Sequence, residues 1–161
     1  LKLDTEPSAD EIISLVEREL DRGEYKEVVF CGLGEPTIRL KELVHVGRKL
    51  RARGVRVRLD SNGQGSLIHG HDIVPELKEA VDEVSVSLNA ADAARYAALC
   101  RPPGGEKAFA GVLDFIKRSV AAGIRTSVTA VAVPDVDVEH VRAIADSLGA
   151  AFRPRKYNRL G

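Results

Sequence analysis

Helix-like and strand-like patterns alternate along this chain, and that alternation restricts the possible folds more than any other feature of the sequence. The strand patterns lie in residues 27–31, 55–59, 84–89, 124–133 and 151–155. The helical patterns lie in residues 8–20, 40–50, 73–80, 91–99, 107–121 and 138–148. Strands separated by helices pair in parallel through right-handed crossovers, so the alternation predicts a parallel α/β sheet.

The length of the chain limits the size of that sheet. Successive strands lie about 30 residues apart, as in repeated βαβ units. A closed barrel of eight such units typically takes about 250 residues, and this chain has 161. It contains no internal repeat, linker or low-complexity segment. We therefore predict a single α/β domain over residues 1–161, built as an open, partial parallel (β/α) barrel.

The composition is that of a globular protein and gives no signal for several kinds of partner. Hydrophobic residues make up 44% of the chain, enough for a substantial core. The 24 basic and 24 acidic residues cancel, so the bulk charge favours neither nucleic acid nor a membrane as partner. No apolar run reaches the roughly 18 residues of a membrane span. We expect Cys31 and Cys100 to be buried free thiols in a cytoplasmic protein.

Residues 32–36 form the most informative short segment, because they follow a strand directly. Gly32 and Gly34 allow a sharp turn and leave backbone amide and carbonyl groups uncovered. Pro36 favours an extended conformation for Glu35, which gives the loop a defined shape. The carboxyl ends of strands are where α/β folds place their ligands. We therefore predict a binding loop; a tight loop without a ligand is the alternative.

Polar residues at the ends of the other strands should converge on the same rim. The residues expected there, together with Glu35, are Asp60, Asn62, Ser87, Asn89 and Arg155. Ser85, Ser87 and Asn89 also make one face of the strand at 84–89 polar, whereas parallel strands are usually apolar on both faces. This pattern predicts a ligand with hydroxyl groups, such as a ribose. An ordinary solvent-facing side of the strand is the alternative.

At this point the motifs resemble those of a known family. Gly32-Leu33-Gly34-Glu35-Pro36 resembles the Gly-x-Gly-Glu-Pro motif of the radical S-adenosylmethionine (radical SAM) enzymes. Residues 60–63, read as DSNG, and the strand at 84–89 resemble the next two conserved segments of that superfamily. More narrowly, CGLGEPTIRL, SNGQGSLIHG, VSLNA, LCRP and RKYNRLG look like the radical SAM proteins associated with the TatD family.

The resemblance implies a set of cofactor-binding residues. Backbone groups of Gly32, Gly34, Glu35 and Pro36 would hold the methionyl amino group of S-adenosylmethionine, with the Glu35 carboxylate adding negative charge nearby. Arg155 would meet the carboxylate of the cofactor or an acidic substrate. The remaining residues would contact the ribose hydroxyls or the methionyl carboxylate, or shape the floor of the site: Asp60, Asn62, Ser85, Ser87 and Asn89.

The resemblance also implies a reaction. Radical SAM enzymes cleave S-adenosylmethionine reductively to methionine and a 5′-deoxyadenosyl radical, using a 4Fe–4S cluster and an electron donor such as flavodoxin or ferredoxin. The radical then takes a hydrogen atom from a substrate, here unknown, with a protein or a nucleoside as the candidates. Within the superfamily, an activating enzyme and a nucleoside-modifying enzyme both remain open.

The sequence departs from the family in one respect. The Cys-x3-Cys-x2-Cys motif, whose three thiolates hold the cluster, is absent, and Cys31 and Cys100 cannot replace it. In the family this motif follows the first strand and precedes a helix like that at 8–20. We therefore expect the first strand and the cluster ligands to lie upstream of Leu1, and expect no metal ligands and no radical chemistry in the chain as given.

Three other interpretations of the sequence compete with this one. A dinucleotide-binding enzyme would need a third glycine opening a helix, where Pro36 and Thr37 stand instead. His69 and His71 could lie near a metal, but two solvated histidines in the loop at 64–72 are the preferred interpretation. A catalytically inactive partner domain would expose an apolar patch where the first strand is missing.

Overall fold

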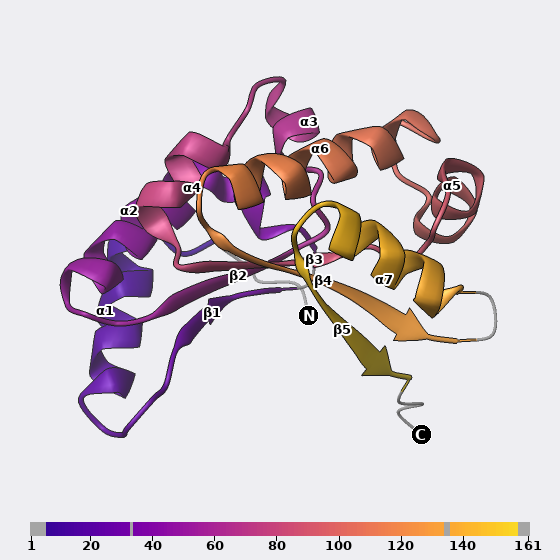
Figure 1. The fold of residues 1–161 in the computed structure, drawn as a ribbon. Coiled ribbons are helices and arrows are strands. Elements are labelled where there is room, and N and C mark those ends of the chain that lie inside the picture. Colours follow the sequence, from indigo (N-terminus) through magenta and orange to yellow (C-terminus); the bar gives the residue numbers. More distant parts are fainter. Residues whose placement is uncertain (1–5, 33, 134–135, 158–161) are drawn as a thin grey trace.

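The computed structural model describes residues 6–32, 34–133 and 136–157. Its centre is one five-stranded sheet in which every neighbouring pair is parallel, as the alternation predicted. In spatial order, which is also chain order, the strands are β1 (Val28–Phe30), β2 (Val57–Ser61), β3 (Glu83–Ser87), β4 (Arg125–Ala132) and β5 (Ala151–Lys156). The sheet is open, with β1 and β5 at its two edges (Figure 1).

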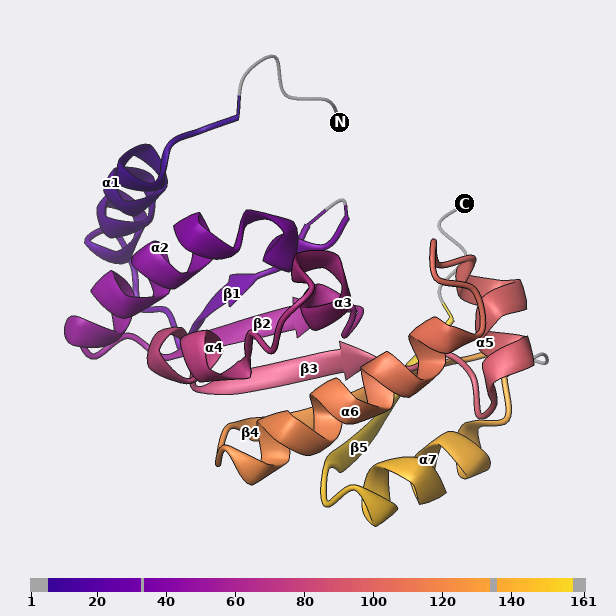
Figure 2. The ribbon, with the colours of Figure 1, turned by 90° about the horizontal axis from the view of Figure 1, so that it is seen from above.

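The described helices lie on one side of this sheet, as the two views at right angles show (Figures 1 and 2). They are α1 (Ala9–Leu20), the 3-10 helix η1 (Pro36–Arg39), α2 (Leu40–Ala52), α3 (Gly65–His69), α4 (Val74–Ala80), α5 (Ala93–Cys100), α6 (Lys107–Ala121) and α7 (Val138–Ser147). Because the strands follow one another in space, right-handed crossovers return each helix over the same face.

The hydrophobic core lies between the helices and that face of the sheet. Alternate strand residues point into it, and Leu59, Val84 and Val128 are fully buried there. They meet helix residues such as Leu50 of α2 and Ile116 of α6, which are also fully buried. Each such side chain contributes roughly 1.5–3 kcal/mol relative to exposure, so this layer is the main source of stability.

A close backbone contact joins α2 to α4. A Cβ atom at Gly47 would overlap the carbonyl oxygen of Ala80 and lie 3.0 Å from the Ala80 Cβ. Glycine is therefore the residue that allows these two helices to pack at this distance.

The first helix begins as its sequence predicts. The Ser8 hydroxyl accepts from the Glu11 amide at 3.2 Å, and the Glu11 carboxylate accepts from the Ser8 amide at 2.7 Å. This reciprocal pair is a capping box, which satisfies amides at the helix start. No helix in the described part of the chain is long and apolar enough to cross a membrane.

Some local predictions were wrong. The segment at 64–72 contains a short helix, α3, where a loop was expected, because Gly65 packs there against Thr37 and Ile73. Cys31 is exposed rather than buried, since it stands past the end of β1, and Cys100 is only partly buried. Leu33 of the predicted binding loop, and residues 158–161 of the last segment that carries the resemblance, lie outside the described residues.

Candidate functional site

The side of the sheet opposite the helices, here called the helix-free face, is polar along nearly all of its strands. Strand alternation and register place the following residues on it: Glu27, Arg58, Asp60, Glu83, Ser85, Ser87, Arg125, Ser127, Thr129, Arg153 and Arg155. This explains the polar pattern of the strand at 84–89, because no described helix covers that side. The face is therefore available to a ligand.

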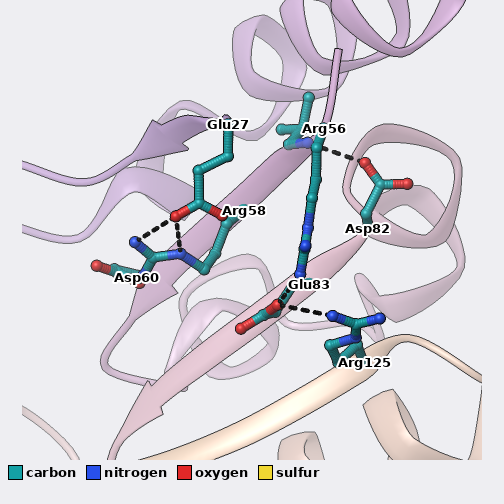
Figure 3. A network of polar contacts seen from close by, with 8 residues as sticks. Glu27, Arg56, Arg58, Asp60, Asp82, Glu83 and Arg125 are labelled. Atoms are coloured by element: carbon teal, nitrogen blue, oxygen red, sulfur yellow. Dashed lines mark hydrogen bonds and ion pairs between the residues drawn. The ribbon is translucent and has the colours of Figure 1, made fainter. Parts of the chain in front are cut away.

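At the amino ends of the strands, the charged side chains of the helix-free face form ion pairs with one another (Figure 3). Glu83 of β3 accepts from Arg56 at 2.8 Å and lies 3.9 Å from Arg125 of β4. The Arg58 side chain pairs with Glu27 at 3.1 Å and also with Asp60. Burial disfavours the charged form of Arg58, but these two carboxylates outweigh it and raise its pKa. The charges at this end of the face are thus balanced.

Towards the carboxyl ends of the strands, the same face holds a cavity of about 300 Å³. The register sets the residues in rows, with Asp60 beside Ser85 and with Ser87 beside Thr129, which in turn lies beside Arg153. The lining residues are Arg58, Asp60, Ser85, Ser87, Thr129, Arg153, Pro154 and Arg155. Four of the residues predicted from sequence are therefore brought together. Thr129 and Arg153 were missed; their alternation along a strand was the available signal.

The predicted binding loop borders a second hollow, of about 260 Å³. Its lining residues are Glu6, Cys31, Gly32, Gly34, Glu35, Pro36, Ile38 and Arg39. A Cβ atom added at Gly32 or Gly34 would meet no atom within 4 Å, so the outer side of the loop is open. Gly34 has a φ of +132°, a conformation that strains any residue with a side chain. The loop thus presents uncovered backbone to the hollow, which fits a cradle for a polar ligand.

The Glu35 carboxylate holds this loop in place. One oxygen accepts from the Thr37 amide at 3.1 Å, the Thr37 hydroxyl at 2.7 Å and the Ser61 hydroxyl at 2.9 Å. The other accepts from the Asn62 amide at 2.7 Å. The Glu35 residue is 8% exposed. That the Glu35 carboxylate adds negative charge near a bound ligand stays a prediction. Its hydrogen bonds tie the loop after β1 to the end of β2.

The side chains of the two predicted asparagines also accept hydrogen bonds from backbone amides. Asn62 accepts from the Gln64 amide at 2.8 Å, and Asn89 accepts from the Val131 amide at 3.2 Å. In each case the amide oxygen is used within the protein, and the amide nitrogen remains as a donor. Within the described part of the chain, each of the two asparagines thus has one structural contact and an amide nitrogen with no hydrogen-bond partner.

The donor set in this chain does not fit a 4Fe–4S cluster. Cys31 follows β1 and Cys100 ends α5, and no third cysteine occurs in the sequence. Within residues 6–32, 34–133 and 136–157, no group of three or more His, Cys, Asp or Glu side chains is arranged to hold a metal ion. His71 is exposed, as expected, and bonds to Glu76 at 3.0 Å; His69 is partly buried and contacts the Thr37 carbonyl at 2.7 Å.

Similarity to solved structures supports this description of the fold. SuiB of Streptococcus suis, solved with S-adenosylmethionine bound, aligns with 99% of this chain and 36% of its own, at a TM-score of 0.72 and 15% identity. A domain of pyruvate-formate lyase-activating enzyme from Bacteroides vulgatus aligns with 81% of this chain and 99% of its own, at a TM-score of 0.56 and 14% identity. At these identities the likeness shows a shared fold, the open parallel sheet of the radical SAM partial barrel.

Sequence similarity identifies the family. GTP 3′,8-cyclase of Corynebacterium glutamicum (strain R) is 33% identical over 138 residues, which are 80% of this chain and 34% of the cyclase. The chain thus spans about a third of the length of that relative. The model of the radical SAM superfamily matches residues 2–148. The chain therefore belongs to the radical SAM superfamily.

Proposed function

We propose that residues 1–161 form one domain, the cofactor-binding core of a radical SAM enzyme, which holds S-adenosylmethionine at the carboxyl rim of the sheet. The observation that carries this proposal is the loop at 32–36. Its glycine backbone is open to a hollow, and four hydrogen bonds to Glu35 fix it against β2. Such a fixed set of backbone dipoles can bind a charged group without reorganising.

Different rim residues would bind different parts of the cofactor. The backbone at Gly32, Gly34, Glu35 and Pro36 would receive the methionyl amino group. Ser85, Ser87 and the amide nitrogen of Asn89 would bond the ribose hydroxyls, while Asp60 and Asn62 would shape the floor. Arg155 would meet a negatively charged group of the cofactor or of the substrate.

Bound S-adenosylmethionine supplies a radical that takes a hydrogen atom from the substrate when the cofactor is cleaved reductively. The residues of this chain would orient the cofactor for that step. Since the two cysteines do not fit a 4Fe–4S cluster, we propose that its ligands lie outside these 161 residues. An electron donor of the flavodoxin or ferredoxin type, a cytoplasmic location and kinship to the TatD-associated proteins belong to the same proposal.

Of the two substrate classes open from sequence, a nucleoside-type substrate has the better support. The curated relative is named for its action on GTP and matches most of this chain. The activating-enzyme domain shares the fold at 14% identity, which carries less weight for a protein substrate.

Binding of S-adenosylmethionine by the 161-residue chain, measured by isothermal titration calorimetry, tests the proposal. Gly32→Val should weaken binding at least tenfold without changing the melting temperature, because its side chain would enter the open hollow. Gly104→Val, in the loop before α6, is the matched control and should bind like the original chain. Absence of binding, or equal binding by Gly32→Val, would refute the proposal.

A non-enzymatic partner domain is the second candidate, and the open edge of β1 favours it. Among the described strands, β1 pairs only with β2, which leaves one side of Val28–Phe30 without a strand neighbour. Such an edge can accept another strand. This candidate predicts no affinity for S-adenosylmethionine, so the same titration separates the two.

A further inference from the structure

The cavity on the helix-free face has more positive charge than its own carboxylate balances. Three arginines and one aspartate line it, and Arg58 already pairs with Asp60 and with Glu27. Within the described part of the chain, Arg153 and Arg155 take part in no ion pair. The surplus charge of the cavity therefore comes from these two side chains of β5.

The position of Arg153 and Arg155 follows from the register of β5 on β4. Arg153 lies beside Thr129 and Arg155 beside Val131, on the face opposite Phe152, whose ring packs under Arg142 of α7. Thr129 is 2% exposed and Ser85 is 4% exposed, so hydroxyl-bearing residues form a sheltered floor beside the arginines. A solvated strand edge would lack such a floor. Arg153 and Arg155 themselves are exposed, so an anion can reach them from solvent while the hydroxyl-bearing residues lie beneath it.

The chemistry of these groups favours an oxyanion, such as a phosphate, as the ligand. A guanidinium group presents parallel N–H donors that match the oxygens of a phosphate, and hydroxyl groups add further donors. Residues two apart on a strand are separated by roughly 6.6 Å, so the two arginines can converge on one phosphate or bracket two linked phosphates. We propose that the substrate carries a phosphate or diphosphate group, bound by Arg153 and Arg155 with the hydroxyl of Thr129.

The carboxylate of S-adenosylmethionine is the other anion to be considered, and the sheet argues against it. The amino and carboxylate groups of a methionyl unit are attached to one carbon. The loop at 32–36 follows β1, whereas Arg153 and Arg155 are on β5, four strand spacings away along the curved sheet (Figure 1). At about 4.8 Å per spacing, the two places are far apart along the sheet compared with the span of one methionyl unit, which favours a separate anion at the arginines. That this anion belongs to a substrate rests on the proposed function.

A hollow at the other end of the strands, of about 460 Å³, is a weaker candidate for an anion site. It also has three arginines in its lining, Arg51, Arg56 and Arg125. Two carboxylates already pair with them, since Arg51 lies 3.0 Å from Asp82 and Arg56 lies 2.8 Å from Glu83. Its charge is therefore largely satisfied within the protein, unlike that of Arg153 and Arg155.

The probes for a test are pyrophosphate and orthophosphate, titrated by calorimetry into the 161-residue chain. We expect saturable binding, tighter for pyrophosphate, and a loss of at least tenfold in the double variant Arg153→Gln/Arg155→Gln. Lys156→Gln removes one positive charge from the other face of the same strand and should change affinity less than twofold. No binding, or equal weakening by Lys156→Gln, would overturn the proposal, because either result means no site or only general charge attraction.

A second titration separates this proposal from the cofactor site. S-adenosylmethionine should bind equally with and without saturating pyrophosphate, and the double variant should leave its affinity within twofold. Competition between the two ligands, with the double variant weakening both, would assign the arginines to the cofactor and overturn the substrate assignment. Arginine-dependent binding of pyrophosphate to a chain that does not bind S-adenosylmethionine would support the anion site and refute the radical SAM function instead.

Discussion

The carboxylate of Glu35 accepts a hydrogen bond from the hydroxyl of Ser61 at 2.9 Å, and this bond joins the loop after β1 to the end of β2. The Ser61 hydroxyl in turn accepts from the Gly63 amide at 2.9 Å. Two segments that carry the family resemblance, at 32–36 and at 60–63, are thus parts of one hydrogen-bonded unit. Their co-occurrence in the sequence has a structural reason.

We expect Glu35→Gln to lower the free energy of unfolding by about 1–3 kcal/mol, because an amide NH₂ would face a donor now bonded to the carboxylate. Affinity for S-adenosylmethionine should fall with it, as the loop loses its fixed shape. Urea denaturation and calorimetry measure the two effects, with Glu106→Gln, an exposed residue, as the control. Loss of affinity without loss of stability would instead indicate that the negative charge of the carboxylate acts on the cofactor, as the family resemblance implies.

The contact between α2 and α4 gives a prediction for stability alone. In a helix interior, Gly→Ala is usually stabilising by about 1 kcal/mol. At Gly47 we expect the opposite, a loss of about 1–2 kcal/mol, since the new methyl group would meet the backbone of Ala80. Gly111→Ala in α6 is the control, because its Cβ would meet the end of the half-exposed Leu67 side chain, which can move. Equal effects of the two changes in a urea titration would contradict this account of the packing.

The sequence was sufficient for the fold because the fold depends on periodicity and chain order. Five strands joined by helices, in sequential right-handed crossovers, leave one face of the sheet bare, and this determines which strand residues meet a ligand. The exposure of a residue just past the end of a strand does not follow from periodicity and chain order. Cys31 was expected to be buried, but its exposure depends on what covers the loop at 32–36, which no local pattern encodes.

The candidate site was only partly predictable for a related reason. Asp60, Ser85, Ser87 and Arg155 could be placed from strand ends and alternation. Arg153 and Thr129 enter the cavity through the register of β5 on β4, which tertiary packing sets. The short helix α3 likewise depends on the contact of Gly65 with Thr37 and Ile73. Neither residue is a neighbour of Gly65 in the sequence, so a local pattern does not reveal the contact.

The capping box predicts a pH dependence. The Ser8 amide, and then its hydroxyl, bond the Glu11 carboxylate and hold its pKa below the ordinary value. A lowered folded-state pKa contributes stability above the unfolded-state pKa, and this is lost as the pH falls through the folded-state value. Urea denaturation should therefore find Glu11→Gln less stable than the original chain at pH 7, with the difference shrinking towards pH 3. The control Glu24→Gln should show no such trend, and a difference that persists at pH 3 would contradict the assignment.

The two cysteines should differ in reactivity towards N-ethylmaleimide. Cys31 is exposed and lines the hollow at the loop, whereas burial raises the pKa of the Cys100 thiol and disfavours its reactive thiolate. We expect Cys31 to be labelled several-fold faster, and S-adenosylmethionine to protect Cys31 but not Cys100. Peptide mass spectrometry of time points measures both rates. Faster labelling of Cys100, or no protection of Cys31, would argue against a ligand in this hollow.

The most direct test of the central claim is a titration of S-adenosylmethionine into the ¹⁵N-labelled chain, followed by two-dimensional NMR. The account predicts that the amide signals of Gly32, Gly34, Ser85 and Ser87 shift together and saturate with one affinity. Gly54 and Arg125, beside the hollow at the opposite end of the strands, should not shift. Absence of shifts, or shifts confined to that opposite end, would contradict the claim that the carboxyl rim of this sheet binds the cofactor.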